Sequence, residues 1–149
     1  IGILPYEKNL KCIVASKFGK GFIADLKDIQ TSQRKGKQLF NLKLGDELMS
    51  ITGNLNSHIA CVSKNSKILI FETKFLPILR KGGGVQLQKI KKDEALSDIQ
   101  SFNLSDGVTW KIGSQLRKEK DINFWIGKRA QVGKKVPKRF NKNLKFFNE

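Results

Sequence analysis

The feature that most constrains the fold of this chain is an internal repeat with a period of about 46 residues. The segment CIVASKFGKGFI at 12–23 aligns with IACVSKNSKILI at 59–70, and the two share a serine-lysine pair and a later lysine at matching positions. Farther along, Arg34-Lys35-Gly36 aligns with Arg80-Lys81-Gly82. A repeat of this length indicates one supersecondary unit that is stacked several times.

Each unit is predicted to contain four short β-strands. The apolar segments are brief, and polar or glycine-containing turns such as Lys17-Phe18-Gly19 separate them, as in β-hairpins. Four strands in 40 to 50 residues is the size of a propeller blade, so we expect an all-β, propeller-like fold. The predicted strands are 12–16, 20–26, 37–44 and 48–52 in the first unit, and 59–63, 67–72, 84–90 and 99–104 in the second.

The pattern weakens after Phe102, where we expect a partial third blade and then a basic tail. Residues 118–126 are predicted to form a short helix or turn that carries Phe124 and Trp125 inward. Some of the tail is expected to pack, because it contains Phe146 and Phe147. The predicted organisation is one domain fragment over 1–149, with blades at 12–52 and 59–104, a partial blade at 108–140 and a tail at 141–149.

The formal net charge of +16, from 29 cations against 13 anions, predicts an anionic partner, and nucleic acid is the leading candidate. An acidic membrane surface and a lysine-rich genome are the alternatives. Basic residues recur at the turns of successive units, which favours contact with regularly spaced phosphates. The candidate DNA-contacting residues are Lys20, Arg34, Lys35, Lys37, Lys67, Arg80, Lys81, Lys128, Arg129, Lys134 and Lys135.

The sequence contains no arrangement typical of a catalytic, metal or cofactor site. Gly19-Lys20-Gly21 lacks the third glycine of a dinucleotide motif, and His58, the only histidine, has no second ligand nearby. Cys12 and Cys61 lie in short apolar strands, where we expect them to be reduced and buried, which favours a cytoplasmic protein. The sequence contains no run of 18 consecutive apolar residues and therefore predicts no membrane span.

Several segments together resemble the C-terminal domain of the bacterial gyrase A/topoisomerase IV A family, on the topoisomerase IV side. These segments are GKGFI at 19–23, RKGKQLFNL at 34–42, SKILIFET at 66–73, LPILRKGGGVQLQK at 76–89, LSDI at 96–99, GVTW at 107–110 and WIGKRAQ at 125–131. The gyrase members carry a Gln-Arg-Arg-Gly-Gly-Lys/Arg-Gly box, and here residues 33–39 match only its start. This departure favours topoisomerase IV over the DNA-wrapping domain of gyrase.

The resemblance implies a β-pinwheel, in which four-stranded blades exchange strands and bind double-stranded DNA on a basic outer rim. It implies a non-catalytic domain of an ATP-dependent type II topoisomerase that decatenates and relaxes DNA. The tyrosine nucleophile, ATP and Mg²⁺ would belong to other parts of that enzyme, a heterotetramer with a separate ATPase subunit. A basic propeller that binds an acidic protein and an RNA-binding repeat domain are the alternative functions.

Overall fold

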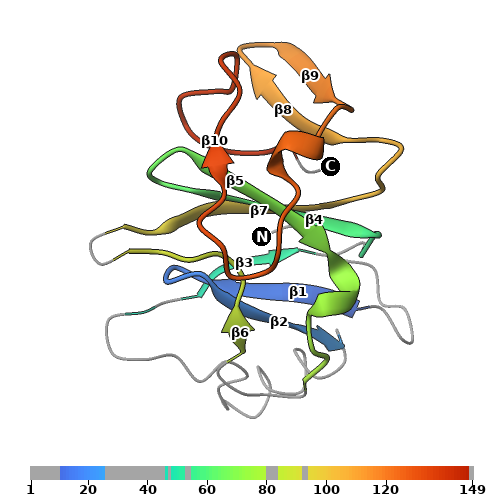
Figure 1. Cartoon of the computed structure of the whole chain (residues 1–149), viewed down its shortest axis with the longest axis vertical. Helices are drawn as coiled ribbons and strands as arrows, with labels where there is room; N and C mark the ends of the chain where they lie inside the picture. The colour runs from blue at the N-terminus through green and yellow to red at the C-terminus, as the bar shows by residue number, and fades with distance from the viewer. Residues whose placement is uncertain are drawn as a thin grey trace.

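The computed structural model describes residues 11–25, 46, 48–52, 55–79, 84–91 and 94–147, and this part of the chain is almost entirely β-structure (Figure 1). The first sheet contains, in spatial order, β3 (Leu48–Thr52), β1 (Lys11–Ser16), β2 (Lys20–Asp25) and β6 (Val85–Gln86). The second contains β10 (Lys134–Lys135), β5 (Lys67–Glu72), β4 (His58–Ser63) and β7 (Leu96–Phe102). A third sheet is the hairpin of β8 (Val108–Ile112) and β9 (Gln115–Glu119).

The two four-stranded sheets repeat each other in detail. In each, a central antiparallel hairpin, β1–β2 or β4–β5, is joined on one side by a later strand of its own unit, β3 or β7. A register shift occurs at the same place in both, between Ala15 and Ser16 in β1 and between Val62 and Ser63 in β4. The all-β repeat predicted from the sequence is therefore confirmed.

The outer strand of each sheet comes from the following unit, as the resemblance implied. β6 follows β5 in the chain but pairs with β2, and β10 follows β9 but pairs with β5. The predicted strands at 12–16, 20–26, 48–52, 59–63, 67–72 and 99–104 agree with the structure within a few residues, while 84–90 is reduced to β6. The predicted strand at 37–44 lies outside the described residues, and the blade boundaries stay a prediction.

The second sheet is buried on both faces, which explains why its central strands are apolar at successive positions. Ile59 and Cys61 face the first sheet, in a core shared with Ile13 and Leu87. Ala60 and Val62 point to the opposite face, because β-strand side chains alternate. They pack against the third hairpin and against residues 138–147, which we call the C-terminal segment. Burial raises the pKa of the Cys61 thiol, as expected for a reduced cysteine in an apolar core.

One predicted orientation is wrong. Residues 123–125 form a short 3₁₀ turn, η2 (Asn123–Trp125), which turns Trp125 toward the second core but leaves the Phe124 side chain 57% exposed. The indole nitrogen of Trp125 donates to the carbonyl oxygen of Lys135 at 2.9 Å, so this ring fastens η2 to β10. The Phe124 ring instead packs edge-on against Trp125 at the surface.

Candidate nucleic-acid interface

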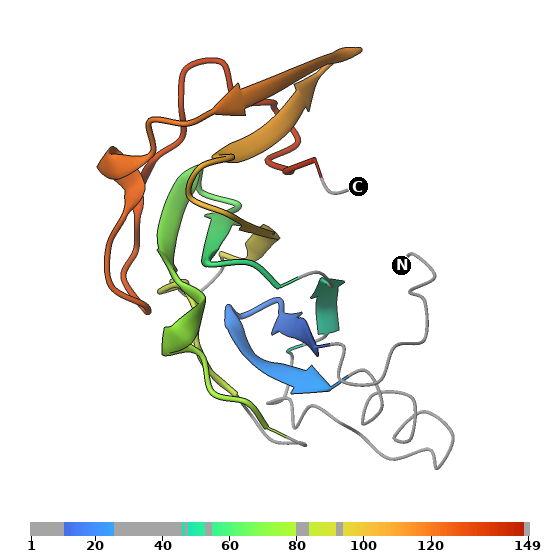
Figure 2. The same ribbon diagram turned by 90° about the vertical axis from the view of Figure 1, so that its right-hand side faces the viewer.

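Two equivalent segments carry the chain from one unit into the sheet before it. We call them the first exchange segment, residues 73–88, of which 80–83 lie outside the described residues, and the second exchange segment, residues 123–137. Each begins with a 3₁₀ turn, η1 (Thr73–Phe75) or η2, and ends in an exchanged strand, β6 or β10. In Figure 2 the two 3₁₀ turns, η1 (green) and η2 (orange), lie one below the other on the left side of the molecule.

The path of each exchange segment is fixed by backbone contacts at the same two places. An isolated parallel bridge joins Ile78 to Ile23 in the first segment and Ile126 to Ile70 in the second. Farther along, Gly84 (φ +71°) and Gly133 (φ +89°) precede the exchanged strands. A Cβ at either glycine would collide with backbone atoms of the strand that the segment is about to join. Glycine is therefore required where the chain enters the neighbouring sheet.

The cations of the second exchange segment gather around β10. Lys135 lies directly opposite Lys67 across the β10–β5 pair, and Lys134 is opposite Ile68. Directly opposed side chains in an antiparallel pair have Cβ atoms about 5 Å apart, so two like charges there repel each other. Lys134 and Lys135 are both exposed, and the Lys134 ammonium lies 4.6 Å from the centre of the Phe124 ring. An anion bound at this pair would relieve the repulsion.

The equivalent position in the first sheet has half of this charge. Lys20 lies opposite Gln86 in the β2–β6 pair, so a glutamine stands where the second sheet has Lys135. The Gln86 amide donates to the carbonyl oxygens of Phe18 and Gln88. The two exchanged strands therefore share geometry but differ in charge.

Arg129 is a structural residue as well as a cation. Its guanidinium donates to the carbonyl oxygen of Gln86 at 2.7 Å, and it is half-buried. Backbone bonds from Ala130 to Leu87 and from Lys89 to Gln131 continue this contact. The second exchange segment is thus tied to the end of the first, and Arg129 and Lys20 are both brought to the β6 strand.

The described candidate residues lie in the second exchange segment or at the start of the strands that the exchanged strands join, and we call this set the exchange edge: Lys20, Lys67, Lys128, Arg129, Lys134 and Lys135. Lys128, like the two β10 lysines, is exposed. The other predicted DNA-contacting residues, Arg34, Lys35, Lys37, Arg80 and Lys81, lie outside the described residues.

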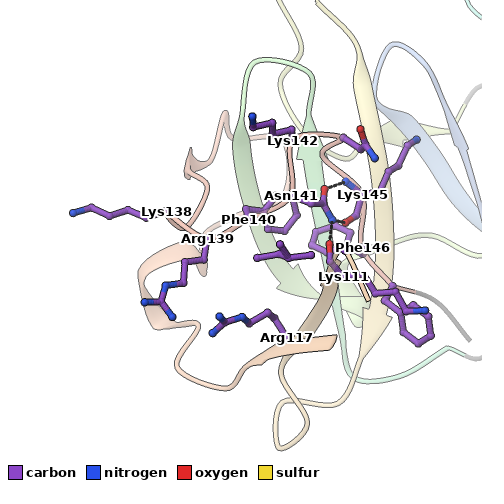
Figure 3. Close-up of a pocket in the computed structure, with 13 residues that line it drawn as sticks. Lys111, Arg117, Lys138, Arg139, Phe140, Asn141, Lys142, Lys145 and Phe146 are labelled. Carbon is purple, nitrogen blue, oxygen red and sulfur yellow. Dashed lines mark hydrogen bonds between the residues drawn. The ribbon is translucent and has the colours of Figure 1, made fainter. Parts of the chain in front are cut away.

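A second group of cations was not predicted from the sequence. It lines a pocket of about 850 Å³ between the β8–β9 hairpin and the C-terminal segment (Figure 3): Lys111, Arg117, Lys138, Arg139, Lys142 and Lys145. The only available signal was the excess of eight cations over one anion in residues 128–149. Arg117 could not be assigned to this group from sequence, because it belongs to β9 and joins it only through folding.

Within the described residues, no group of three histidine, cysteine or acidic side chains is placed to hold a metal ion. The same part of the chain includes no helix with the length and apolarity needed to cross a membrane.

Comparison with known proteins places the chain in a family. A family model described as "DNA gyrase C-terminal domain, beta-propeller" matches residues 11–52 and 57–103. The A subunit of DNA topoisomerase 4 from Rickettsia bellii is 35% identical over 144 residues, which cover 97% of this chain and 19% of that protein. Its counterpart in Caulobacter vibrioides is 33% identical over 98% of this chain and 19% of that protein. The chain thus spans about a fifth of the length of these relatives.

Solved structures show the same fold. The Escherichia coli ParC C-terminal domain superposes with a TM-score of 0.72 at 18% identity, covering 92% of this chain and 60% of that one. A C-terminal domain of DNA topoisomerase IV gives 0.70 at 22% identity, covering 91% and 43%. The strand exchange, the matched residues and the curated relatives lead to one assignment: the chain belongs to the family of DNA gyrase A and topoisomerase IV A C-terminal domains.

Proposed function

We propose that this chain is a non-catalytic domain that binds duplex DNA through its phosphates and holds a bent segment for a catalytic core elsewhere. The observation that carries this proposal is the exchange edge, where Lys67 and Lys135 are held opposite each other by strand pairing. A folded domain keeps such a repulsive pair at a cost, which an anionic partner offsets.

The chemistry of the exchange edge suits a phosphate backbone better than base edges. Its cations are mainly lysines at the ends of short strands, and a lysine ammonium is a point charge that contacts phosphate without reading sequence. The exchanged strands β6 and β10 are outer strands of successive sheets, and this repetition suits a curved duplex. Bending a duplex costs about 1 to 6 kcal/mol, so several such contacts must act together.

In the intact protein we propose the wider role implied by the relatives' names. The domain would serve a cytoplasmic type II topoisomerase, which works with a separate ATPase subunit in ATP-dependent decatenation and relaxation. The domain itself would supply no catalytic group and would raise the local concentration of DNA near the core.

The test is an anisotropy titration of the chain with two 20-base-pair duplexes of unrelated sequence at several salt concentrations. We expect the two duplexes to bind alike, with log affinity falling linearly against log salt by about 0.9 per phosphate contacted. An excess of poly-glutamate should compete poorly. Absence of salt-sensitive binding, or a strong preference for one sequence, would overturn the proposal; tight binding of poly-glutamate without DNA binding would favour a protein-interaction domain.

A further inference from the structure

The cationic pocket at the C-terminal end is a preformed surface, because its walls are fastened at many points. The indole nitrogen of Trp110 donates to the carbonyl oxygen of Arg139 at 3.0 Å. The Asn141 amide donates to the carbonyl oxygens of Lys111 and Lys145, and its oxygen accepts from the Lys145 amide. These bonds join the C-terminal segment to β8 and fix the loop on which the cations stand (Figure 3).

The far end of the C-terminal segment is anchored to the second sheet. The Phe146 amide donates to an Asp98 carboxylate oxygen at 2.9 Å, and the Lys145 ammonium donates to the Ser97 carbonyl oxygen. The Phe147 amide donates to the Thr109 carbonyl oxygen, and Phe146 is 7% exposed. The pocket therefore exists before any ligand arrives, and binding there would need little reordering.

Four of the lining cations are not neutralised in the described part of the chain. In that part of the chain a salt bridge joins Lys74 to Glu72, which are far from the pocket in sequence. The residues that line the pocket include no aspartate or glutamate. Lys145 is engaged with Ser97, and Lys111 lies over the Phe147 ring at 4.6 Å. The uncompensated cations are Arg117, Lys138, Arg139 and Lys142.

These cations suit closely spaced phosphates. Figure 3 shows the side chains of Arg117, Lys138 and Arg139 projecting to the same side of the hairpin. A guanidinium can contact a phosphate through two parallel N–H···O bonds, and two arginines stand here on different elements. Duplex DNA carries one charge per roughly 1.7 Å of axis, a density that an extended acidic peptide, at about 3.4 Å per residue, cannot match.

The pocket also follows the exchange edge directly along the chain. Only Val136 and Pro137 separate Lys135 in β10 from Lys138, so the two α-carbons are at most about 11 Å apart. A duplex whose phosphates lie on β10 therefore has its next phosphates within reach of the pocket.

We propose that this pocket is a second phosphate-backbone site, which holds the duplex as it leaves the exchanged strand β10. The inference rests on the proposed function and deepens it, because it assigns where the DNA goes beyond the exchange edge. The pocket sets the path of the duplex over the third unit, and it does so without base contacts.

The experiment compares Arg117→Gln/Arg139→Gln with the control Lys118→Gln/Lys120→Gln, each of which removes two charges. Lys118 neighbours Arg117 in β9 and points to the other face of the strand, outside the pocket lining. With a 20-base-pair duplex, we expect the pocket variant to lower the log-log salt slope by up to about 1.8, and the control to lower it by much less.

A local readout on the unsubstituted chain accompanies the variants. The amide resonances of Gly113 and Asn143, both in the pocket lining, should shift when the duplex is added, and the shifts should be smaller in the pocket variant. Equal slopes for the pocket variant and the control, or unshifted Gly113 and Asn143 amides, would overturn the inference while leaving the proposed function intact. Poly-glutamate that shifts these amides and is not displaced by duplex would overturn it in favour of an acidic protein partner. If the unsubstituted chain shows no salt-sensitive duplex binding, the proposed function fails first.

Discussion

The β1–β2 turn and the β4–β5 turn have the same backbone but different requirements for side chains. In both, the fourth residue donates its amide to the carbonyl oxygen of the first at 3.0 Å, from Gly19 to Ser16 and from Ser66 to Ser63. Both fourth residues have positive φ, +85° at Gly19 and +66° at Ser66. Yet a Cβ at Gly19 would lie 2.7 Å from Ile90 Cγ1 and 2.8 Å from the Gln88 carbonyl oxygen. Ser66 has a Cβ and remains half-exposed.

The difference arises from what the chain does after each exchanged strand. Beyond β6 it continues across the β1–β2 turn, so Gln88 and Ile90 cover Gly19. Beyond β10, the Val136 amide bonds to Ser66 and the chain then turns at Pro137 toward the C-terminal segment. Both sheets thus make the same strand exchange, whereas the path of the chain after the exchanged strand determines whether the turn is covered or lies beside the cationic pocket.

The largest expected effect comes from Gly19→Ala. The new Cβ would occupy a left-handed conformation, which costs about 1–2 kcal/mol. It would also overlap Ile90 and the Gln88 carbonyl oxygen, which adds about 1–3 kcal/mol. We expect the free energy of unfolding in urea to fall by about 2–5 kcal/mol.

Ser66→Ala is the matched control for Gly19→Ala, because Ser66 has the same turn position and an existing Cβ. Its free energy of unfolding should change by less than about 1 kcal/mol. Equal losses at the two positions would show that the cover over Gly19 has no energetic consequence.

A smaller effect is expected from Gln86→Lys, which gives the first sheet the charge that the second has at Lys135. Because Lys20 lies opposite position 86, the substitution recreates the Lys67–Lys135 pair. Duplex affinity should rise several-fold, and the log-log salt slope should steepen by about 0.9.

Gln86→Glu is the control for this substitution, since both variants lose the same amide hydrogen bonds to Phe18 and Gln88. The glutamate variant should bind duplex more weakly than the unsubstituted chain. If lysine and glutamate at position 86 gave the same affinity, the first exchanged strand would not contact DNA.

The smallest effect concerns Asp98, where the C-terminal segment is anchored. Burial raises the pKa of the Asp98 carboxyl, although bonds from the Phe146 and Ile99 amides and the charges of Lys145 and Lys64 oppose the shift. The folded protein therefore binds this proton more tightly than the unfolded chain does. The resulting stability is present at a pH below the ordinary aspartate pKa and is lost as pH rises through the folded pKa.

Asp98→Asn keeps an oxygen that can accept from the Phe146 amide but removes the titration. The free energy of unfolding of the variant, relative to the unsubstituted chain, should increase as pH rises from 3 through the folded pKa of Asp98. Urea unfolding at a series of pH values measures this difference. A difference that decreases over the same range would contradict the account.

The strands could be predicted from sequence because each unit repeats short apolar segments between turns, as in 12–16 and 59–63. The sheet that each outer strand joins could not be predicted from the repeat, since the repeat period is the same whether β6 pairs within its own unit or with β2. Only the family resemblance implied the exchange. The prediction that the Phe124 side chain points inward was wrong for a similar reason. Its apolarity was visible, but η2 turns Trp125 inward, and the Phe124 ring faces Lys134 at the surface.

The candidate site was predictable as recurring charge but not as geometry. The sequence located Lys67 and Lys135 as cations, and strand pairing then set them opposite each other. Arg129 was predicted as a cation of a turn, and its bond to the Gln86 carbonyl oxygen is a tertiary contact between two exchange segments. Arg117 and Arg139 meet only because the C-terminal segment folds back onto the hairpin.

The central claim is that the exchange edge binds DNA phosphates, and the salt dependence of duplex binding by Lys67→Gln/Lys135→Gln tests it most directly. With both lysines in contact with phosphate, the account predicts a log-log salt slope shallower by about 1.8 and an affinity weaker by about tenfold or more at fixed salt. The control, Lys118→Gln/Lys120→Gln, removes the same charge from residues that are not part of this edge. A slope that changes equally in the two variants would mean that only the net charge of the chain matters, and would contradict the claim.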